Sequence, residues 1–512
     1  MYTFSSKLKT FSFILMIVGI LGIGYGFLTA PKNIEEVEKI LAANEHGEHH
    51  SEATEGHEAA PAHHETEEAH AKVPAHEGHE AADVAKAAVP VNAAEKDLDT
   101  MHVDTLSVAV APAAENHESP AATHKTHKAE VHDAHAEHQE HLEHVFHQLQ
   151  NKPWAALYVA CIFFMFISLG VLAFYAIQQV AQAGWSPVLF RVMQGITAYL
   201  PVGSIIFFIL LVIIAFTNSG SVHLNHLFIW MDPEVVAHDK LIQNKSGYLN
   251  VPFWLIRAAI FLIGWNLYRY YSRKNCLAQD ESDNDLFYKK NFKLSAGFLV
   301  FFIVTESIMS WDWIMSIDPH WFSTLFGWYV FMSFFVSSVT TICLVTLYLK
   351  SKGYLEHVNT SHIHDLAKFM FGFSVFWTYL WFSQFMLIWY ANIPEEVTYF
   401  ITRIEHYNLP FFGAVVMNFL FPILILVNTD FKRITWVLVM AGVVILAGHY
   451  IDFFNMIMPS SVGDQWFIGI PEIGAVFFFL GLFLLVVFTA LTKVPLLSKR
   501  NPFIEESKHF HY

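Results

Sequence analysis

Long apolar runs alternate with short polar segments along most of this chain. A helix of about 20 apolar residues crosses the hydrocarbon core of a bilayer. The runs lack the alternation typical of barrel strands, and in lipid only helices and closed barrels satisfy their own backbone polar groups. The pattern therefore predicts an all-α integral membrane protein with about ten transmembrane helices. The predicted spans are 11–30, 154–177, 193–217, 251–272, 293–316, 323–349, 367–391, 409–428, 434–454 and 468–492.

One long segment, residues 31–152, breaks this pattern. It holds 25 Asp or Glu against 8 Lys, together with 19 of the 30 His of the chain, and it is poor in aromatic residues. Because such a composition cannot bury a core, we expect the segment to be largely disordered. Histidines recur every third residue from His132 to His147, a spacing that a helix could carry. They are either metal-binding or pH-responsive groups, or part of a solvated tether.

The first apolar run resembles a secretion signal because two lysines precede it. It is longer than the apolar region of such a signal, Pro31 follows where cleavage would fall, and no A-x-A pattern is present. We therefore expect an uncleaved anchor. The predicted domains are a transmembrane anchor at 1–30, the acidic His-rich segment at 31–152, a helical bundle at 153–495 and a tail at 496–512.

The basic residues predict the orientation. If the N-terminus lies inside, the inner segments hold 18 Lys or Arg and the short outer loops hold 3. Short loops rich in Lys and Arg stay in the cytoplasm. We therefore expect both termini to be cytoplasmic and the His-rich segment to lie on the outer side.

Composition excludes several classes of protein. The chain is 54% hydrophobic and only 15% charged, which is unlike a soluble enzyme. Its net charge of −16 argues against nucleic acid as a partner. Three widely spaced cysteines argue against a disulfide scaffold and against a cysteine-ligated cluster. Since His449 is the only histidine within a predicted span, a bis-histidine haem is not expected either. We predict no catalytic residue and no metal site.

Ionisable side chains inside the spans are few, and they lie toward the outer side. Charged groups are costly there and usually functional. Glu306 is ten residues from the outer end of its span, which places it about 15 Å deep at 1.5 Å per residue. No acidic or basic residue lies comparably deep in the inner half. The candidates for a proton path are Glu306, Asp312, His320, His449, Asp452, Glu472 and Arg257.

Each of these residues also has a structural interpretation. Glu306 is either a proton carrier or a buried, hydrogen-bonded acid. His449 and Asp452 are three residues apart and share a helix face, so they form either a proton relay or a structural pair. Arg257 either anchors the membrane interface or binds a ligand.

Three stretches carry a family resemblance. ESIMSWDWIMSIDPHWFSTLFGWY spans Glu306 to Tyr329, WYANIPEEVTYF spans Trp389 to Phe400, and GHYIDFFNMIMP spans Gly448 to Pro459. They resemble the membrane subunits of bacterial alternative complex III, which belong to the NrfD/PsrC-like superfamily. The span count and the hydrophilic insertion are more similar to the subunit type called ActF than to its paralogue ActC. The resemblance covers roughly residues 150–495.

The resemblance implies a fold and a function. It implies two four-helix bundles side by side, formed by spans two to five and six to nine, with spans one and ten peripheral. The function is that of a membrane subunit of a quinol:cytochrome c (electron acceptor) oxidoreductase in the respiratory chain of a bacterial inner membrane, with the His-rich segment periplasmic. The subunit serves as scaffold and candidate proton path, and the resemblance leaves open whether it binds quinol or menaquinol.

The resemblance also implies partners. They are a paralogous quinol-binding membrane subunit, an iron–sulfur protein, pentahaem and monohaem c-type cytochromes, lipids and often a terminal cytochrome oxidase. Haem c and iron–sulfur clusters belong to these partners, and the chain itself binds no cofactor. A stand-alone ion or metal transporter, supplied by the His-rich segment, is the alternative that the residues leave open.

Overall fold

The computed structural model describes residues 1–42, 123–218 and 224–511, with the side chains of all of these except 123–137 and 140. The chain divides into two units, residues 40–138 and the remainder. Most of the His-rich segment lies outside the described residues, and so does the prediction that this segment is disordered. The fold below is that of the larger unit, residues 1–39 and 139–512.

The described residues form helices and no strand, as the apolar pattern predicts. Ten helical segments among them are long and apolar enough to cross a membrane, and each overlaps one predicted span. The chain is therefore an all-α membrane protein. The helices are α1 (Ser6–Thr29), α3 (Thr123–Val180), α4 (Phe190–Ile196), α5 (Tyr199–Asn218), α6 (Pro233–His238), α7 (Lys240–Lys245), α8 (Val251–Gln279), α9 (Leu286–Trp313), α10 (Phe326–Ser351), α11 (Thr360–Ala391), α12 (Pro394–Glu405), α13 (Asn408–Val415), α14 (Phe421–Leu426), α15 (Thr435–Val462), α16 (Ile470–Leu491) and α17 (Ile504–Lys508).

Helix α3 runs through the histidine repeat into the second span without a break. The boundary predicted between residues 152 and 153 therefore lies inside a helix. Pro153 sits within it, a position where the missing N–H and the ring commonly disturb the helix. The apolar run predicted at 154–177 lies within this longer helix.

Two helices form the centre of the unit. In the most apolar stretches of α3 and α10, 94% and 89% of the residues are buried, against 28% in α1 and α11. The hydroxyl of Ser338 on α10 donates to the carbonyl of Ile167 on α3 at 2.9 Å. The Phe166 ring on α3 packs against Phe334 on α10. Helices buried on all sides are apolar all round, which explains the uniform hydrophobicity of these two spans.

The helix contacts divide the spans other than α1 and α16 into two bundles, with α3 in the first and α10 in the second. In the first bundle, α8 packs against α5 and α9, and Tyr158 of α3 donates to the Trp313 carbonyl at 2.8 Å. In the second bundle, α10 packs against α11 and α15, and α13 and α14 pack against α15. Contacts between α9 and α10 join the bundles. This is the pair of four-helix bundles that the family resemblance implies.

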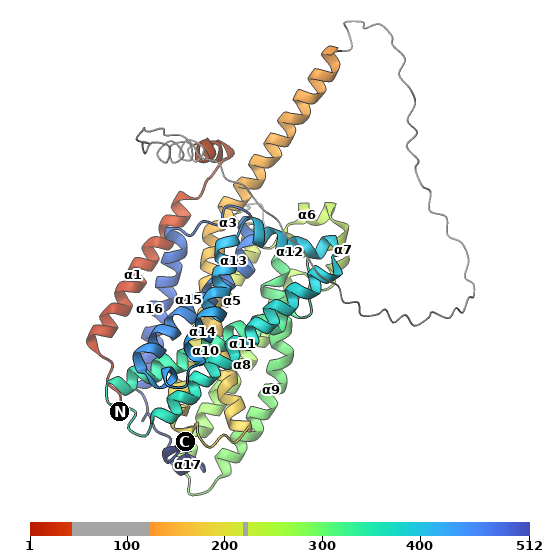
Figure 1. The fold of residues 1–512 in the computed structure, drawn as a ribbon. Coiled ribbons are helices and arrows are strands. Elements are labelled where there is room, and N and C mark those ends of the chain that lie inside the picture. The colour runs from red at the N-terminus through yellow and green to blue at the C-terminus, as the bar shows by residue number, and fades with distance from the viewer. Residues whose placement is uncertain (43–122, 219–223, 512) are drawn as a thin grey trace, which may run out of the picture. The chain divides into compact units, whose positions relative to one another are not determined.

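Helices α1 and α16 lie side by side along one flank of the unit (Figure 1). Their contact is made by glycines, which let two backbones approach closely in lipid. A Cβ atom on Gly22 would lie 2.9 Å from the Gly474 Cα, and one on Gly474 would lie 2.8 Å from the Gly22 Cα. Spans one and ten are therefore held to each other by backbone packing.

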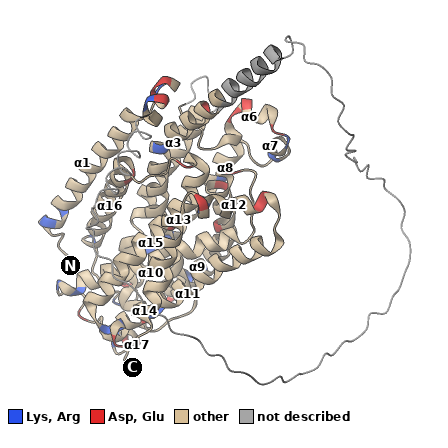
Figure 2. Ribbon diagram, turned by 45° about the horizontal axis from the view of Figure 1, so that its top comes forward, with Lys and Arg blue, Asp and Glu red and all other residues tan. Residues whose placement is uncertain are grey.

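The two ends of the unit differ. Both termini lie at one end, which we call the terminal end, and α6, α7 and α12 lie at the opposite end (Figure 1). Lys and Arg lie mainly toward the terminal end (Figure 2). A chain that crosses a membrane an even number of times ends on the side where it began. The position of both termini at one end therefore agrees with ten spans.

Because the α1–α16 contact has no room for a side chain at Gly474, we predict that Gly474→Leu destabilises the protein in detergent. Overpacking a close contact typically costs about 1–3 kcal/mol. Thermal unfolding measures the effect. Gly297→Leu is the matched control, because Gly297 is an exposed helical glycine with open space around its Cβ position. Equal losses in both variants would contradict the packing explanation.

Candidate functional site

The predicted proton-path residues do not form one site. The structure distributes them over five separate groups, and within the described chain no hydrogen bond joins one group to another. All five lie toward the end opposite the termini or near mid-span. The groups are Arg257 with Asp312, Glu306 with two serines, His449 and Asp452 with three partners, Glu472 at a helix start, and His320 with Asp239.

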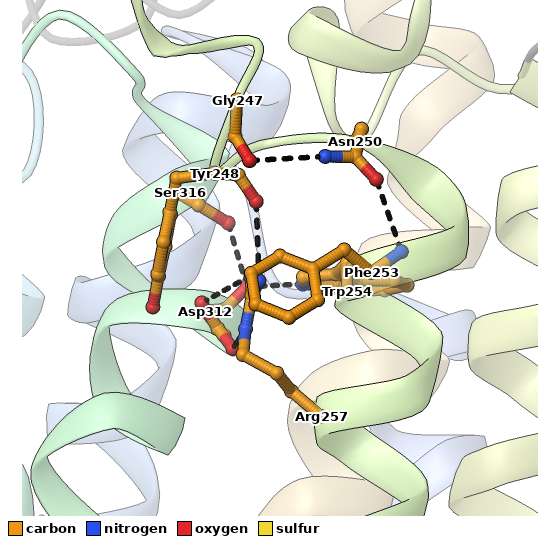
Figure 3. A network of polar contacts seen from close by, with 8 residues as sticks. All are labelled: Gly247, Tyr248, Asn250, Phe253, Trp254, Arg257, Asp312 and Ser316. Atoms are coloured by element: carbon orange, nitrogen blue, oxygen red, sulfur yellow. Dashed lines mark hydrogen bonds and ion pairs between the residues drawn. The ribbon is translucent and has the colours of Figure 1, made fainter.

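Arg257 and Asp312 form a bidentate ion pair between α8 and α9 (Figure 3). Arg257 Nε donates to Asp312 Oδ2 at 2.6 Å and Nη2 donates to Oδ1 at 2.9 Å. Both residues are buried. Two parallel bonds match the fork of the guanidinium to the carboxylate and fix the orientation of both side chains. The pair therefore ties the two helices together.

Further groups complete this ion pair. Arg257 Nη1 donates to the Tyr248 carbonyl at 3.1 Å, and the guanidinium lies 3.9 Å from the centre of the Tyr248 ring. The Trp254 indole and the Ser316 hydroxyl donate to the Asp312 carbonyl at 2.8 and 2.6 Å. Carbonyls in the last turn of a helix have no hydrogen-bond partner within the helix, so these two donors satisfy one of them at the C-terminal end of α9. Burial raises the pKa of the Tyr248 phenol, which lies outside the spans.

No cation of the described residues forms an ion pair with Glu306. Its Oε1 accepts from the Ser310 hydroxyl at 3.2 Å and its Oε2 from the Ser307 hydroxyl at 3.3 Å. The side chain is 5% exposed. A buried charge is costly unless it is paired and hydrogen-bonded, and the nearby guanidinium of Arg257 is bound to Asp312 instead. Glu306 is thus a buried carboxyl held by hydroxyls alone.

Asp452 is the centre of a buried polar network in the second bundle. Its Oδ2 accepts from the Ser333 hydroxyl at 2.7 Å and from the Trp377 indole at 2.9 Å, and its Oδ1 accepts from the Tyr329 hydroxyl. All four residues are at least 95% buried. The network connects α10, α11 and α15 in the second bundle.

His449 joins this network through a hydroxyl. Its Nδ1 lies 3.1 Å from the Ser333 Oγ and 3.9 Å from Asp452 Oδ2, so Ser333 bridges the two. The Ser333 proton is donated to Asp452, and the hydroxyl must then accept from the imidazole, which places a proton on Nδ1. His449 Nε2 is buried without a partner in the described part of the chain. The predicted shared face of His449 and Asp452 is confirmed, with a serine between them.

Glu472 caps the start of α16. Its Oε2 accepts from the Gly469 N–H at 2.8 Å, a usual role for Glu at the third helical position. The side chain also lines a groove of about 590 Å³ between α15 and α16, together with Tyr450. The contact pattern favours a structural role for Glu472.

His320 lies outside the spans and contacts Asp239. Its Nε2 lies 2.5 Å from Asp239 Oδ2, and Asp239 also accepts from the Leu241 and Ile242 N–H groups as the cap of α7. The hydrogen bond to His320 is the main reason why the pKa of Asp239 is lowered. This contact fastens α7 to the loop that follows α9.

The sequence did not indicate which residues surround Asp452 and Asp312. They are Tyr329, Ser333 and Trp377 around Asp452, and Trp254 and Ser316 around Asp312. Tyr329 and Ser333 lie one helical turn apart, a signal that they share a face. No local pattern connects them to Asp452, which is more than 100 residues away.

No group of three or more His, Cys, Asp or Glu that could hold a metal ion is found among the residues the structure describes. His132 and His135 lie outside the described side chains. No family model matches the chain, and no curated protein matches it at significant similarity.

Because the Arg257–Asp312 pair is buried, we predict that Arg257→Gln and Asp312→Asn each destabilise the protein by about 3–5 kcal/mol, since each leaves an uncompensated charge. The double variant Arg257→Met/Asp312→Leu should recover most of this loss. Thermal unfolding in detergent measures it, with Lys508→Gln as the control from the partly exposed Lys508–Glu505 pair. A double variant as unstable as the single ones would contradict this account.

The lowered pKa of Asp239 gives a pH prediction. A carboxylate with a folded-state pKa below its usual 3.8 stabilises the fold at pH values above that value, and the contribution is lost as the pH falls through the folded-state pKa. We expect hydrogen exchange in residues 239–245 to accelerate only in strong acid. In His320→Ala the acceleration should begin at higher pH. An unchanged onset would exclude the contribution of His320.

Proposed function

We propose that this chain is a membrane subunit of a bacterial quinol:electron-acceptor oxidoreductase of the alternative complex III type. It acts there as a scaffold and as a proton-conducting path, and it carries no redox cofactor of its own. Support comes from the three resembling stretches and from the ten-span, two-bundle fold. The observation that carries the proton-conducting role is the buried network around Asp452.

The network can move a proton without moving a helix. When the imidazole donates from Nδ1 to the Ser333 oxygen, the serine proton passes to Asp452 Oδ2, 2.7 Å away. The transfer starts from the imidazolium, which carries a proton on Nε2 as well as on Nδ1. The result is a protonated carboxyl and a neutral imidazole that keeps its Nε2 proton. A hydroxyl can play both roles because it is donor and acceptor at once. Tyr329 and Trp377 hold the carboxyl in place during the exchange.

Glu306 supplies a second proton-binding group nearer the middle of the membrane. Its serine partners satisfy the carboxyl without neutralising it. Intramembrane acids of this kind are typical of proton relays. In this proposal Glu306 serves the first bundle and Asp452 the second.

The end opposite the termini is the docking face for the redox partners. Glu395 and Glu396 lie in the first turn of α12, and Glu234 lies in the first turn of α6. We infer from the basic residues at the terminal end that the docking face is periplasmic. This is the side on which c-type cytochromes and an iron–sulfur protein would bind.

The first test is purification of the tagged chain in mild detergent, followed by mass spectrometry and a haem absorption spectrum. We expect c-type haem and an iron–sulfur subunit to co-purify, with quinol:cytochrome c activity. A colourless, solitary protein would overturn the proposal. Metal transport would then be the leading alternative, and deletion of residues 44–147 should change metal accumulation while respiration continues.

Proton conduction has its own test. We predict that Ser333→Ala and Glu306→Gln each lower the number of protons moved per electron transferred, while the complex still assembles. Ser333→Ala removes the bridge between His449 and Asp452 and changes no charge. Asp464→Asn is the control, because Asp464 is an exposed carboxylate near the end of α15. Unchanged proton movement in both test variants would exclude the proton role.

A further inference from the structure

An apolar groove lies between α5 and α8 on the first bundle. Its volume is about 510 Å³, and Ile205 and Ile209 of α5 face Ala259 and Ile263 of α8 along it. The side chains of Ile205, Ile209 and Ile263 are exposed on the surface of the unit. The groove therefore opens sideways, toward the lipid.

The length of the groove matches the thickness of one leaflet. Its residues on α8 run from Ala259 to Tyr270, about 16 Å at 1.5 Å per residue, or roughly half of the hydrocarbon thickness. Arg269 follows Val251, the first residue of α8, by 18 positions, or about 27 Å along the helix axis. The arginine thus lies near the polar boundary of the leaflet at the terminal end.

Two arginines at this boundary lack a protein anion. Within the described chain, no ion pair joins Arg269 or Arg273 to a carboxylate, and the Arg269 Nε is buried without a hydrogen-bond partner. The charged neighbour of Arg269 is Arg273. Arg273 donates to the Gln194 carbonyl at 3.3 Å and faces Arg191. Of these three cations, only Arg191 has a carboxylate, that of Asp280 at 2.5 Å.

A polar pair lies next to the arginines, deeper in the groove. Asn266 Nδ2 donates to the Ser204 hydroxyl at 2.9 Å. Because the Ser204 hydroxyl is the acceptor in this bond, its own proton can be donated to an acceptor on a ligand. From the boundary toward the middle of the membrane, the groove thus offers the cation of Arg269, then a hydroxyl donor, then apolar side chains.

We propose that this groove is a binding site for an anionic phospholipid of the leaflet at the terminal end. The phosphodiester lies against Arg269 and Arg273, an ester carbonyl accepts from Ser204, and one acyl chain follows the apolar wall formed by Ile205, Ile209 and Ile263. Basic pockets between spans on the cytoplasmic side are suited to anionic headgroups. The apolar length of the groove favours a lipid over a free phosphate ion.

Lipid retention on the full chain tests this proposal. The purified protein is mixed with dioleoylphosphatidylglycerol or dioleoylphosphatidylcholine, and the bound lipid is measured by native mass spectrometry. We expect the phosphatidylglycerol to bind more tightly. Since one basic side chain near an anionic lipid contributes about fivefold in affinity, Arg269→Gln/Arg273→Gln should weaken binding about thirtyfold.

Two further variants separate the parts of the site. Ala259→Phe fills the groove and leaves both arginines in place, so it should also weaken binding. Arg500→Gln is the control, because Arg500 is a half-exposed arginine that pairs with Asp283 outside the groove, and its binding should equal that of the unchanged protein. Unchanged binding in the double arginine variant, equal binding of both lipids, or displacement of the lipid by millimolar inorganic phosphate would overturn the proposal.

Discussion

Water is absent from the core of a bilayer, so every polar group there must find its partner within the protein. This constraint explains where the helices of the unit are joined. In lipid, the burial of apolar surface does not drive helices to associate. Close packing and hydrogen bonds between the helices must hold them together instead. The Arg257–Asp312 pair ties α8 to α9, and Asp452 ties α10, α11 and α15 together. The glycines of α1 and α16 provide the other solution, close backbone packing.

The two polar centres differ in what they can do. The carboxylate of Asp312 is bound by a guanidinium, which is always charged and cannot accept a hydrogen bond. A proton has no route through such a pair. Asp452 is bound by groups that include a hydroxyl and, one step further, an imidazole. These exchange protons readily, so the second bundle is the better candidate for conduction and the first bundle is fixed by its ion pair.

Much of the fold could be predicted from the sequence, because apolar length is a local property. All ten spans were found, although α3 begins before its apolar run since the polar helix ahead of it continues without a break. The partners of the buried charges were harder to predict. Glu306 and Asp312 are six residues apart on α9, which turns their side chains about 120° from each other. Arg257 can therefore serve only one of them, and the sequence does not show which.

The distribution of charge over the unit follows from the same constraint. Near the end opposite the termini, Asp312 and Asp452 are buried and each is satisfied by the protein itself. Near the terminal end, no carboxylate of the described chain forms an ion pair with Arg269 or Arg273. The bundle thus satisfies its buried acids with its own donors and, in the proposed lipid site, leaves these two arginines to a phosphodiester.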